Sequence, residues 1–274
     1  MNTAATAQMR PTAFNPDRAL KASAMLWFTV ALIGQALFVV YIAMFYGGST
    51  IAGDFERIDG RVFHGFIAGD MLGNALFMGH VLLAFSITFG GPLQLIPQVR
   101  NRFRTFHRWN GRIYIATAFI ISLGALILVY TRGVIGGPGM IAANTLNAAL
   151  IMGFAFMTIR KAMARDFRSH ERWAVRMFLA VSGVWFFRLG FGFYAFVTGG
   201  EMPGSQNDLE GPFDLSLAFA YSLVPLLVLE LYYRARDAGG SLAKSAMAGG
   251  MLGLTAATGM GIFMAAQIFW LPNM

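Results

Sequence analysis

The sequence contains no cysteine, and this absence excludes several kinds of site. A chain without thiols has no disulfide, no cysteine-bound iron–sulfur cluster and no thiolate zinc site. Charged residues are also few, at 12% of 274 residues, which is about half the share usual in a soluble domain. Hydrophobic residues make up 57%. The composition therefore predicts a membrane protein.

Motifs typical of hydrolases and phosphate-binding loops are missing as well. The sequence has no Gly-x-Ser-x-Gly elbow and no His-Glu-x-x-His zinc helix, because His170-Glu171 lacks the second histidine. Nothing in the sequence identifies an enzyme, so that question stays open. The first 20 residues contain no apolar segment after a basic start, and we expect no cleavable signal peptide.

Seven apolar stretches, separated by glycine- and proline-rich gaps, predict seven transmembrane helices. They lie at residues 22–46, 71–96, 112–131, 141–159, 173–197, 213–233 and 247–271. Each must be helical, because lipid offers no hydrogen-bond partner to an open backbone. We therefore expect an all-α helix bundle, with a cytoplasmic tail at residues 1–21 and one transmembrane domain at residues 22–274.

Positive charge is concentrated on one side of the predicted membrane. Seventeen of the 21 Lys and Arg residues lie in the N-terminal segment and in the loops at 98–112, 160–176 and 233–246, whereas three lie on the other side. This asymmetry predicts a cytoplasmic N-terminus. The net charge of +8 is explained by this topology and by contact with anionic lipids, so no nucleic-acid partner is expected.

Two polar residues, His80 and Arg188, lie deep inside predicted spans, both roughly 25 Å from the cytoplasmic edge. An arginine at a helix centre costs about 2.5–3.5 kcal/mol, so such residues usually face a cavity, a partner or a ligand. We predict an outer polar pocket around them, with Gln94 deeper in the membrane and Asn144 and Asn147 nearby. The alternative is that Arg188 extends to outer lipid phosphates.

Two histidines begin membrane spans on the arginine-rich side, His107 in FRTFHRWNGRIY and His170 in SHERWAVRMF. Imidazole at an interface binds a metal or haem, or carries a proton near neutral pH. One interpretation is that both ligate a single haem iron. The arginines then placed to bind the haem propionates are Arg108, Arg112, Arg172 and Arg176. The other interpretation is that both histidines only hydrogen-bond loop carbonyls.

At these residues the chain resembles a bacterial family of predicted membrane proteins, the domain of unknown function 2306. The resemblance rests on GHVLLAF at 79–85, GPLQLIPQVR at 91–100, HRWNGRIY at 107–114, and HERWAVRMF at 170–178 followed by Arg188. It covers about residues 70–195 and implies a multi-pass protein of a bacterial inner membrane. The family name brings no known activity, so the resemblance concerns membership and not function.

A looser similarity is to four-helix transmembrane b-type cytochromes, in which histidines on alternate helices hold an outer and an inner haem. That similarity implies an inner haem b held by His107 and His170, with His80 and Arg188 shaping a second site for haem or quinone. The fourth predicted span has no histidine, which leaves Met152 or Met140 as an outer partner of His80.

Three functions remain open from the sequence. The first is a redox protein that uses haem b or quinone for electron transfer. The second is a non-enzymatic accessory subunit of a larger membrane complex, with glycines at 249, 250, 253, 259 and 261 suited to close helix contacts. The third is a small-molecule carrier, although no inverted repeat of broken helices is present.

Overall fold

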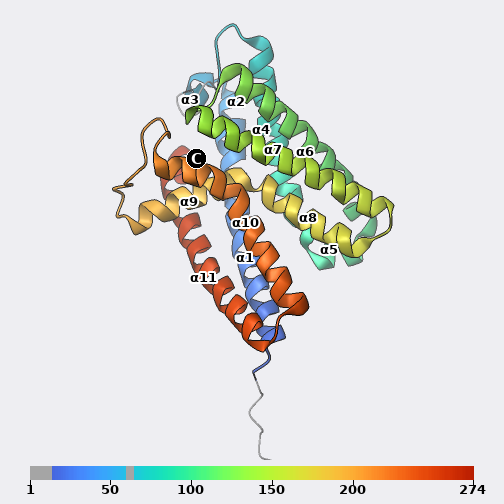
Figure 1. The fold of residues 1–274 in the computed structure, drawn as a ribbon. Coiled ribbons are helices and arrows are strands. Elements are labelled where there is room, and N and C mark those ends of the chain that lie inside the picture. The colour runs from blue at the N-terminus through green and yellow to red at the C-terminus, as the bar shows by residue number, and fades with distance from the viewer. Residues whose placement is uncertain (1–13, 60–64) are drawn as a thin grey trace, which may run out of the picture.

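A computed structural model describes residues 14–59 and 65–274, and these residues form helices and connecting loops without strands (Figure 1). The helices are α1 (Pro16–Ile42), α2 (Gly48–Ala52), α3 (Phe55–Asp59), α4 (Met71–Leu95), α5 (Pro97–Arg102), α6 (Arg104–Arg132), α7 (Gly137–Met163), α8 (Phe167–Val181), α9 (Gly183–Val197), α10 (Pro212–Ala238) and α11 (Ser241–Ala265). Short π-helices (Ala43–Gly47 and Ala266–Trp270) and a 3-10 turn (Leu271–Asn273) complete these segments.

Six of the helical segments are long and apolar enough to cross a membrane. The pair α8 and α9 makes a seventh if the two helices are counted as one bent span. The prediction of an all-α bundle of about seven transmembrane helices is therefore confirmed. The many large apolar side chains on the surface place the bundle in contact with the lipid bilayer.

On the arginine-rich side, several helices are longer than the apolar stretches that predicted them. For example, α6 begins at Arg104 instead of residue 112, and α10 continues to Ala238. The Asn15 side chain accepts hydrogen bonds from two backbone N–H groups and caps α1 at Pro16. The predicted tail is therefore helical from residue 16, and residues 1–13 lie outside the described part of the chain.

The predicted span at 173–197 is two helices that meet at Ser182 with a bend of 56°. The Ser182 hydroxyl donates to the Phe178 carbonyl (2.8 Å) and accepts from Gln35 Nε2 on α1 (2.9 Å). Beside it, Gly183 leaves room for the ring of Tyr221, because a Cβ there would lie 2.6 Å from the ring. The serine–glycine pair thus places the bend where α1 and α10 pack against it.

The helices form two groups that diverge toward the arginine-rich side (Figure 1). In the first group, α11 packs on α1 and α9 around buried aromatic and aliphatic side chains that include Phe38, Trp185 and Trp270. In the second group, α4, α6, α7 and α8 pack in sequence around a core that includes Ile87 and Ile151. Helix α10 contacts both groups.

Within the first group, α9 and α11 approach each other at glycine. A Cβ on Gly261 would lie 2.7 Å from the Leu189 carbonyl oxygen, and a Cβ on Gly192 would lie 2.9 Å from the Ala265 nitrogen. At the other α11 glycines that the sequence suggested for close contacts, an added Cβ would have no atom within 4 Å: Gly249, Gly250, Gly253 and Gly259. The close contact therefore depends on one face of α11.

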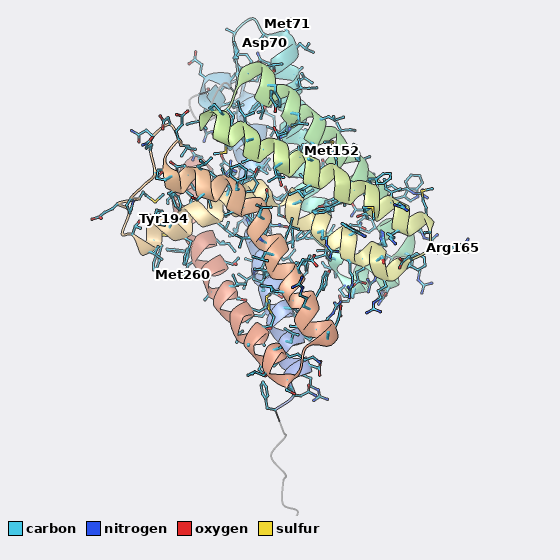
Figure 2. The ribbon with its side chains drawn as sticks, viewed as in Figure 1. Asp70, Met71, Met152, Arg165, Tyr194 and Met260 are labelled. Atoms are coloured by element: carbon cyan, nitrogen blue, oxygen red, sulfur yellow. The ribbon has the colours of Figure 1, made fainter. Side chains whose placement is uncertain are left out.

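The second group extends from Asp70 at one end to the α7–α8 turn at Arg165 at the other (Figure 2). At the first end, Arg132 of α6 donates to Asp70 (2.6 Å) and Asn74 (2.8 Å), and its side chain is 7% exposed. At the other end, the Asp166 side chain caps α8 through the Ser169 N–H (3.1 Å). Local ion pairs and caps thus fix both ends of this group.

Candidate functional site

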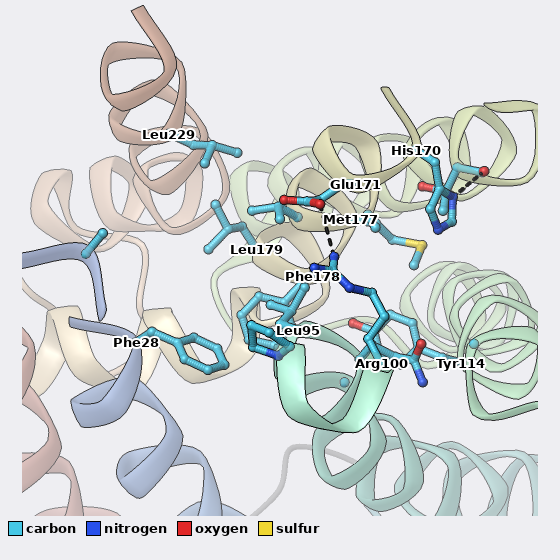
Figure 3. Close-up of a pocket in the computed structure, with 18 of the residues that line it drawn as sticks. Phe28, Leu95, Arg100, Tyr114, His170, Glu171, Met177, Phe178, Leu179 and Leu229 are labelled. Atoms are coloured by element: carbon cyan, nitrogen blue, oxygen red, sulfur yellow. Dashed lines mark hydrogen bonds and ion pairs between the residues drawn. The ribbon is translucent and has the colours of Figure 1, made fainter. Parts of the chain in front are cut away.

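A cleft of about 1270 Å³ lies between the two helix groups on the arginine-rich side (Figure 3). Apolar side chains from both groups form its interior: Trp27, Phe28, Leu95, Leu179, Phe186 and Leu229. Cationic side chains stand along one edge: Arg100, Arg104, Arg108, Arg112 and Arg168. The cleft therefore combines an apolar interior with a polar edge.

The two histidines on this side, His107 of α6 and His170 of α8, both line the cleft. His170 Nδ1 lies 3.0 Å from the carbonyl oxygen of Thr158 on α7. A carbonyl only accepts, so His170 Nδ1 carries the hydrogen and Nε2 keeps a free lone pair when the ring is neutral. This hydrogen-bonding pattern is the usual one for an imidazole that binds a metal.

His107 has the opposite hydrogen-bonding pattern, because Gln94 lies beside it. In the amide orientation that its neighbours satisfy, Gln94 Nε2 donates to His107 Nδ1 (3.0 Å) and Oε1 accepts from the Gly111 N–H (3.2 Å). The neutral His107 ring therefore carries its hydrogen on Nε2. One histidine offers a lone pair and the other offers an N–H, so together they suit a head group that both donates and accepts hydrogen bonds.

A third polar group on the cleft wall has no partner among the described residues. The Tyr114 hydroxyl is buried, and Tyr114 lines the cleft beside Gly91. A buried hydroxyl without a hydrogen bond costs about 1–3 kcal/mol. The hydroxyl therefore lies behind the cleft wall, unpaired among the described residues.

The polar edge of the cleft contains one ion pair, which Arg100 of α5 forms with Glu171 of α8 at 3.0 Å (Figure 3). Both side chains are largely exposed. The other four arginines of the edge have no ion pair with any carboxylate in the described part of the chain. The edge therefore carries an excess of positive charge.

Two arginines predicted to bind haem propionates, Arg172 and Arg176, already have carboxylate partners on α10. Arg176 binds Glu230 (2.6 Å), and Arg172 binds Asp237. Both guanidinium groups also lie over the Tyr233 ring, at 4.8 and 5.5 Å from its centre. These contacts form what we call the α8–α10 latch, and neither arginine lines the cleft. Arg108 and Arg112, by contrast, do line it.

The polar residues predicted for an outer pocket differ in their hydrogen-bond partners. Arg188 donates to the Val184 carbonyl (3.2 Å) and lies over the Phe38 ring, with no ion pair to a described carboxylate. His80 Nδ1 is buried without a hydrogen-bond partner among the described residues. Gln94 belongs instead to the His107 site.

Asn144 and Asn147 join α7 to α10. Asn144 Oδ1 accepts from the Tyr221 hydroxyl (3.0 Å), and Asn147 Oδ1 accepts from the Ser222 hydroxyl (2.9 Å). These side chains therefore serve helix packing in the structure. Met140 is likewise buried between α7 and α10, packed with Ala143 and Ala218, whereas Met152 of α7 is half-buried (Figure 2).

Over residues 14–59 and 65–274, no three His, Asp or Glu side chains gather into a metal site. His64, the fourth histidine, lies outside the described residues. The candidate ligands for a metal or haem are therefore the pair His107 and His170, with His80 standing apart on α4.

The helices together define a multi-pass membrane protein. Residues 77–205 match the family described as predicted membrane protein (DUF2306), which is the family that the sequence motifs predicted. The segment contains both cleft histidines and all five arginines of the edge. No curated protein and no solved structure is similar enough to the chain to count as a match.

Proposed function

We propose that this protein binds an amphipathic small molecule in the cleft on its arginine-rich side. The supporting observation is that one cleft of about 1270 Å³ combines an apolar interior with a polar edge that includes His107 and His170. Apolar pockets with a few convergent polar groups are the usual form of small-molecule sites. The head group would lie by the histidines, and the apolar chain would lie against Trp27 and its neighbours.

Trp27 provides a direct test, because it lines the cleft and its indole N–H donates to Thr258 of α11 (3.2 Å). An amphiphile with a brominated chain should quench the fluorescence of Trp27 saturably. The contribution of Trp27 is the difference between the quenching of wild type and the quenching of the Trp27→Phe variant. Trp109 is 58% exposed and outside the cleft lining, so it reports simple partition into detergent. Quenching of Trp27 that rises without saturation, in parallel with Trp109, would refute the proposal.

A redox function is a second candidate, favoured by the hydrogen bonding of the two histidines. His170 Nε2 offers a lone pair to a quinol hydroxyl, and His107 Nε2 offers its hydrogen to a quinone oxygen. The two tautomers therefore match the donor and acceptor of a quinone-type head group. Chemical extraction of the purified protein, followed by chromatography, tests for bound quinone.

Haem b fits the same pair less directly. His170 already has the required tautomer, whereas His107 would bind iron only if the Gln94 amide turned so that its oxygen accepted from Nδ1. Arg108 and Arg112 remain as partners for the propionates, because Arg172 and Arg176 bind α10. A bound haem would supply one-electron transfer.

The haem proposal is tested by the visible spectrum of the detergent-purified protein, reduced with dithionite minus oxidised in air. His107→Ala and His170→Ala should each abolish a b-type band and leave membrane insertion intact, whereas Arg188→Leu should not affect it. A flat spectrum from folded wild-type protein would exclude haem. If Trp27 quenching also failed to saturate, an accessory-subunit function would remain.

A further inference from the structure

The positive edge of the cleft contains a ladder of like charges along α6. Arg104, Arg108 and Arg112 follow at intervals of four residues, so they lie on one face of the helix about 6 Å apart. Like charges at this spacing destabilise a helix. Arg168, in the first turn of α8, lines the same cleft.

Acidic side chains do not neutralise this ladder. Glu171 is the acidic residue in the cleft lining, and it already binds Arg100 at 3.0 Å. The acids of α10 that lie on this side, Glu230 and Asp237, bind the arginines of the α8–α10 latch. Arg112 lies over the Trp109 ring at 5.0 Å, and it has no carboxylate partner among the described residues. The four arginines are exposed and have no carboxylate partner among the described residues, so they are available to an anion from outside the chain.

The apolar interior limits what kind of anion can enter. Side chains of both helix groups form it, including Phe28 of α1, Leu95 of α4, Leu179 of α8 and Leu229 of α10. A free polar anion would leave this surface facing water. A molecule with an aliphatic chain covers it, at about 25 cal/mol for each Å² of apolar surface removed from water.

We infer that the cleft binds an amphiphile whose head group is a phosphate, held by Arg104, Arg108, Arg112 and Arg168, and whose chain lies in the apolar interior. This inference rests on the proposed function and names its ligand class. Guanidinium groups bind phosphate oxygens through paired hydrogen bonds, so arginine suits this head group better than the single ammonium group of lysine does. A phospholipid of the bilayer and a prenyl phosphate share this chemistry.

The experiment compares a bromoalkyl phosphate with the bromoalkyl maltoside of the same chain, each titrated against Trp27 fluorescence in detergent. We expect the phosphate to bind at least about tenfold more tightly, since each arginine near an anionic surface contributes up to about 1 kcal/mol. Salt at about 0.5 M should weaken binding of the phosphate and leave the maltoside unchanged.

A variant with four substitutions should bind both compounds equally: Arg104→Gln, Arg108→Gln, Arg112→Gln and Arg168→Gln. The matched control changes four exposed arginines that lie outside the cleft lining, and it should keep the preference: Arg18, Arg102, Arg160 and Arg234. Saturable binding of both compounds with equal affinity to wild type would overturn the inference and leave the proposed function standing. Absence of saturable binding by either compound would overturn both.

Competition then distinguishes the two sources of phosphate. Phosphatidylglycerol that displaces the bromoalkyl phosphate supports a bilayer phospholipid as the occupant. Farnesyl phosphate that displaces it, where phosphatidylglycerol does not, supports a prenyl phosphate. Displacement by neither compound would count against a phosphate-headed membrane amphiphile.

Discussion

Substitution of Gly261 by alanine should destabilise the contact between α9 and α11. The added Cβ would lie 2.7 Å from the Leu189 carbonyl oxygen and 3.2 Å from the Leu189 Cβ. The oxygen belongs to the backbone of α9, so it cannot rotate away, and the helices must separate by several tenths of an ångström. Overpacking of this kind costs about 1–3 kcal/mol.

Gly259 is a matched control two residues earlier in α11. A Cβ on Gly259 would meet no atom within 4 Å, so Gly259→Ala introduces no clash. Alanine favours a helix over glycine by up to about 1 kcal/mol, and this variant should be neutral or more stable than wild type. The addition of one methyl group is therefore expected to lower the stability at Gly261 and not to lower it at Gly259.

The assay is thermal unfolding of each variant in detergent, followed by fluorescence, with wild type in parallel. Gly261→Ala should unfold at a lower temperature than wild type, and Gly259→Ala should not. Equal melting temperatures for the two variants would show that α9 and α11 do not approach at Gly261 as the structure has them.

Two further predictions concern ion pairs. Glu230→Gln should lower the free energy of unfolding by about 1–2 kcal/mol, because Arg176 loses its carboxylate partner and that carboxylate is partly exposed. An unchanged melting temperature would contradict the α8–α10 latch. Hydrogen bonds from the Arg132 guanidinium, and next from the Gly73 N–H, hold the pKa of Asp70 below its usual range. The stability that these hydrogen bonds give the folded protein is therefore complete above about 3.9, the pKa of an aspartate in the unfolded chain. It is lost as the pH falls through the lower pKa that Asp70 has in the folded protein. Melting temperature against pH should fall less steeply in acid for Asp70→Asn than for wild type, and parallel curves would contradict the pair.

The membrane helices could be predicted from the sequence because apolar length alone decides whether a segment spans a bilayer. Their ends could not be placed as well, because the last turns on the arginine-rich side are polar on one face. The bend at Ser182 did have a signal, since a serine–glycine pair inside a helix often marks a kink, and Ser182-Gly183 is such a pair.

The candidate site was predicted in part. His107 and His170 were expected on the same side of the membrane, and the structure places both on one cleft. The partners of Arg172 and Arg176 were missed, because the acids that bind them lie 65 and 54 residues further along the chain. Pairing between helices depends on how the bundle folds, and hydropathy does not reveal which helix faces which.

The apolar wall of the cleft was also missed, because its residues look like ordinary membrane-span residues. Trp27 and Leu229 have no feature in the sequence that separates them from lipid-facing neighbours. The spacing of Arg104, Arg108 and Arg112 was the available signal for the charged edge, since an interval of four residues places all three on one helix face.

Because the bend lies at Ser182, a change in the bend angle would move the opposite end of α8 furthest. Helix α8 has 15 residues, so it extends about 22 Å from the bend at 1.5 Å per residue. A rotation of roughly ten degrees about Ser182 would move the far end of α8 by about 4 Å and His170, which is closer to the bend, by about 3 Å. The α8–α10 latch resists that rotation through Arg172 and Arg176. The packing of α8 on α7 and the latch to α10 therefore together hold α8 in place at the cleft.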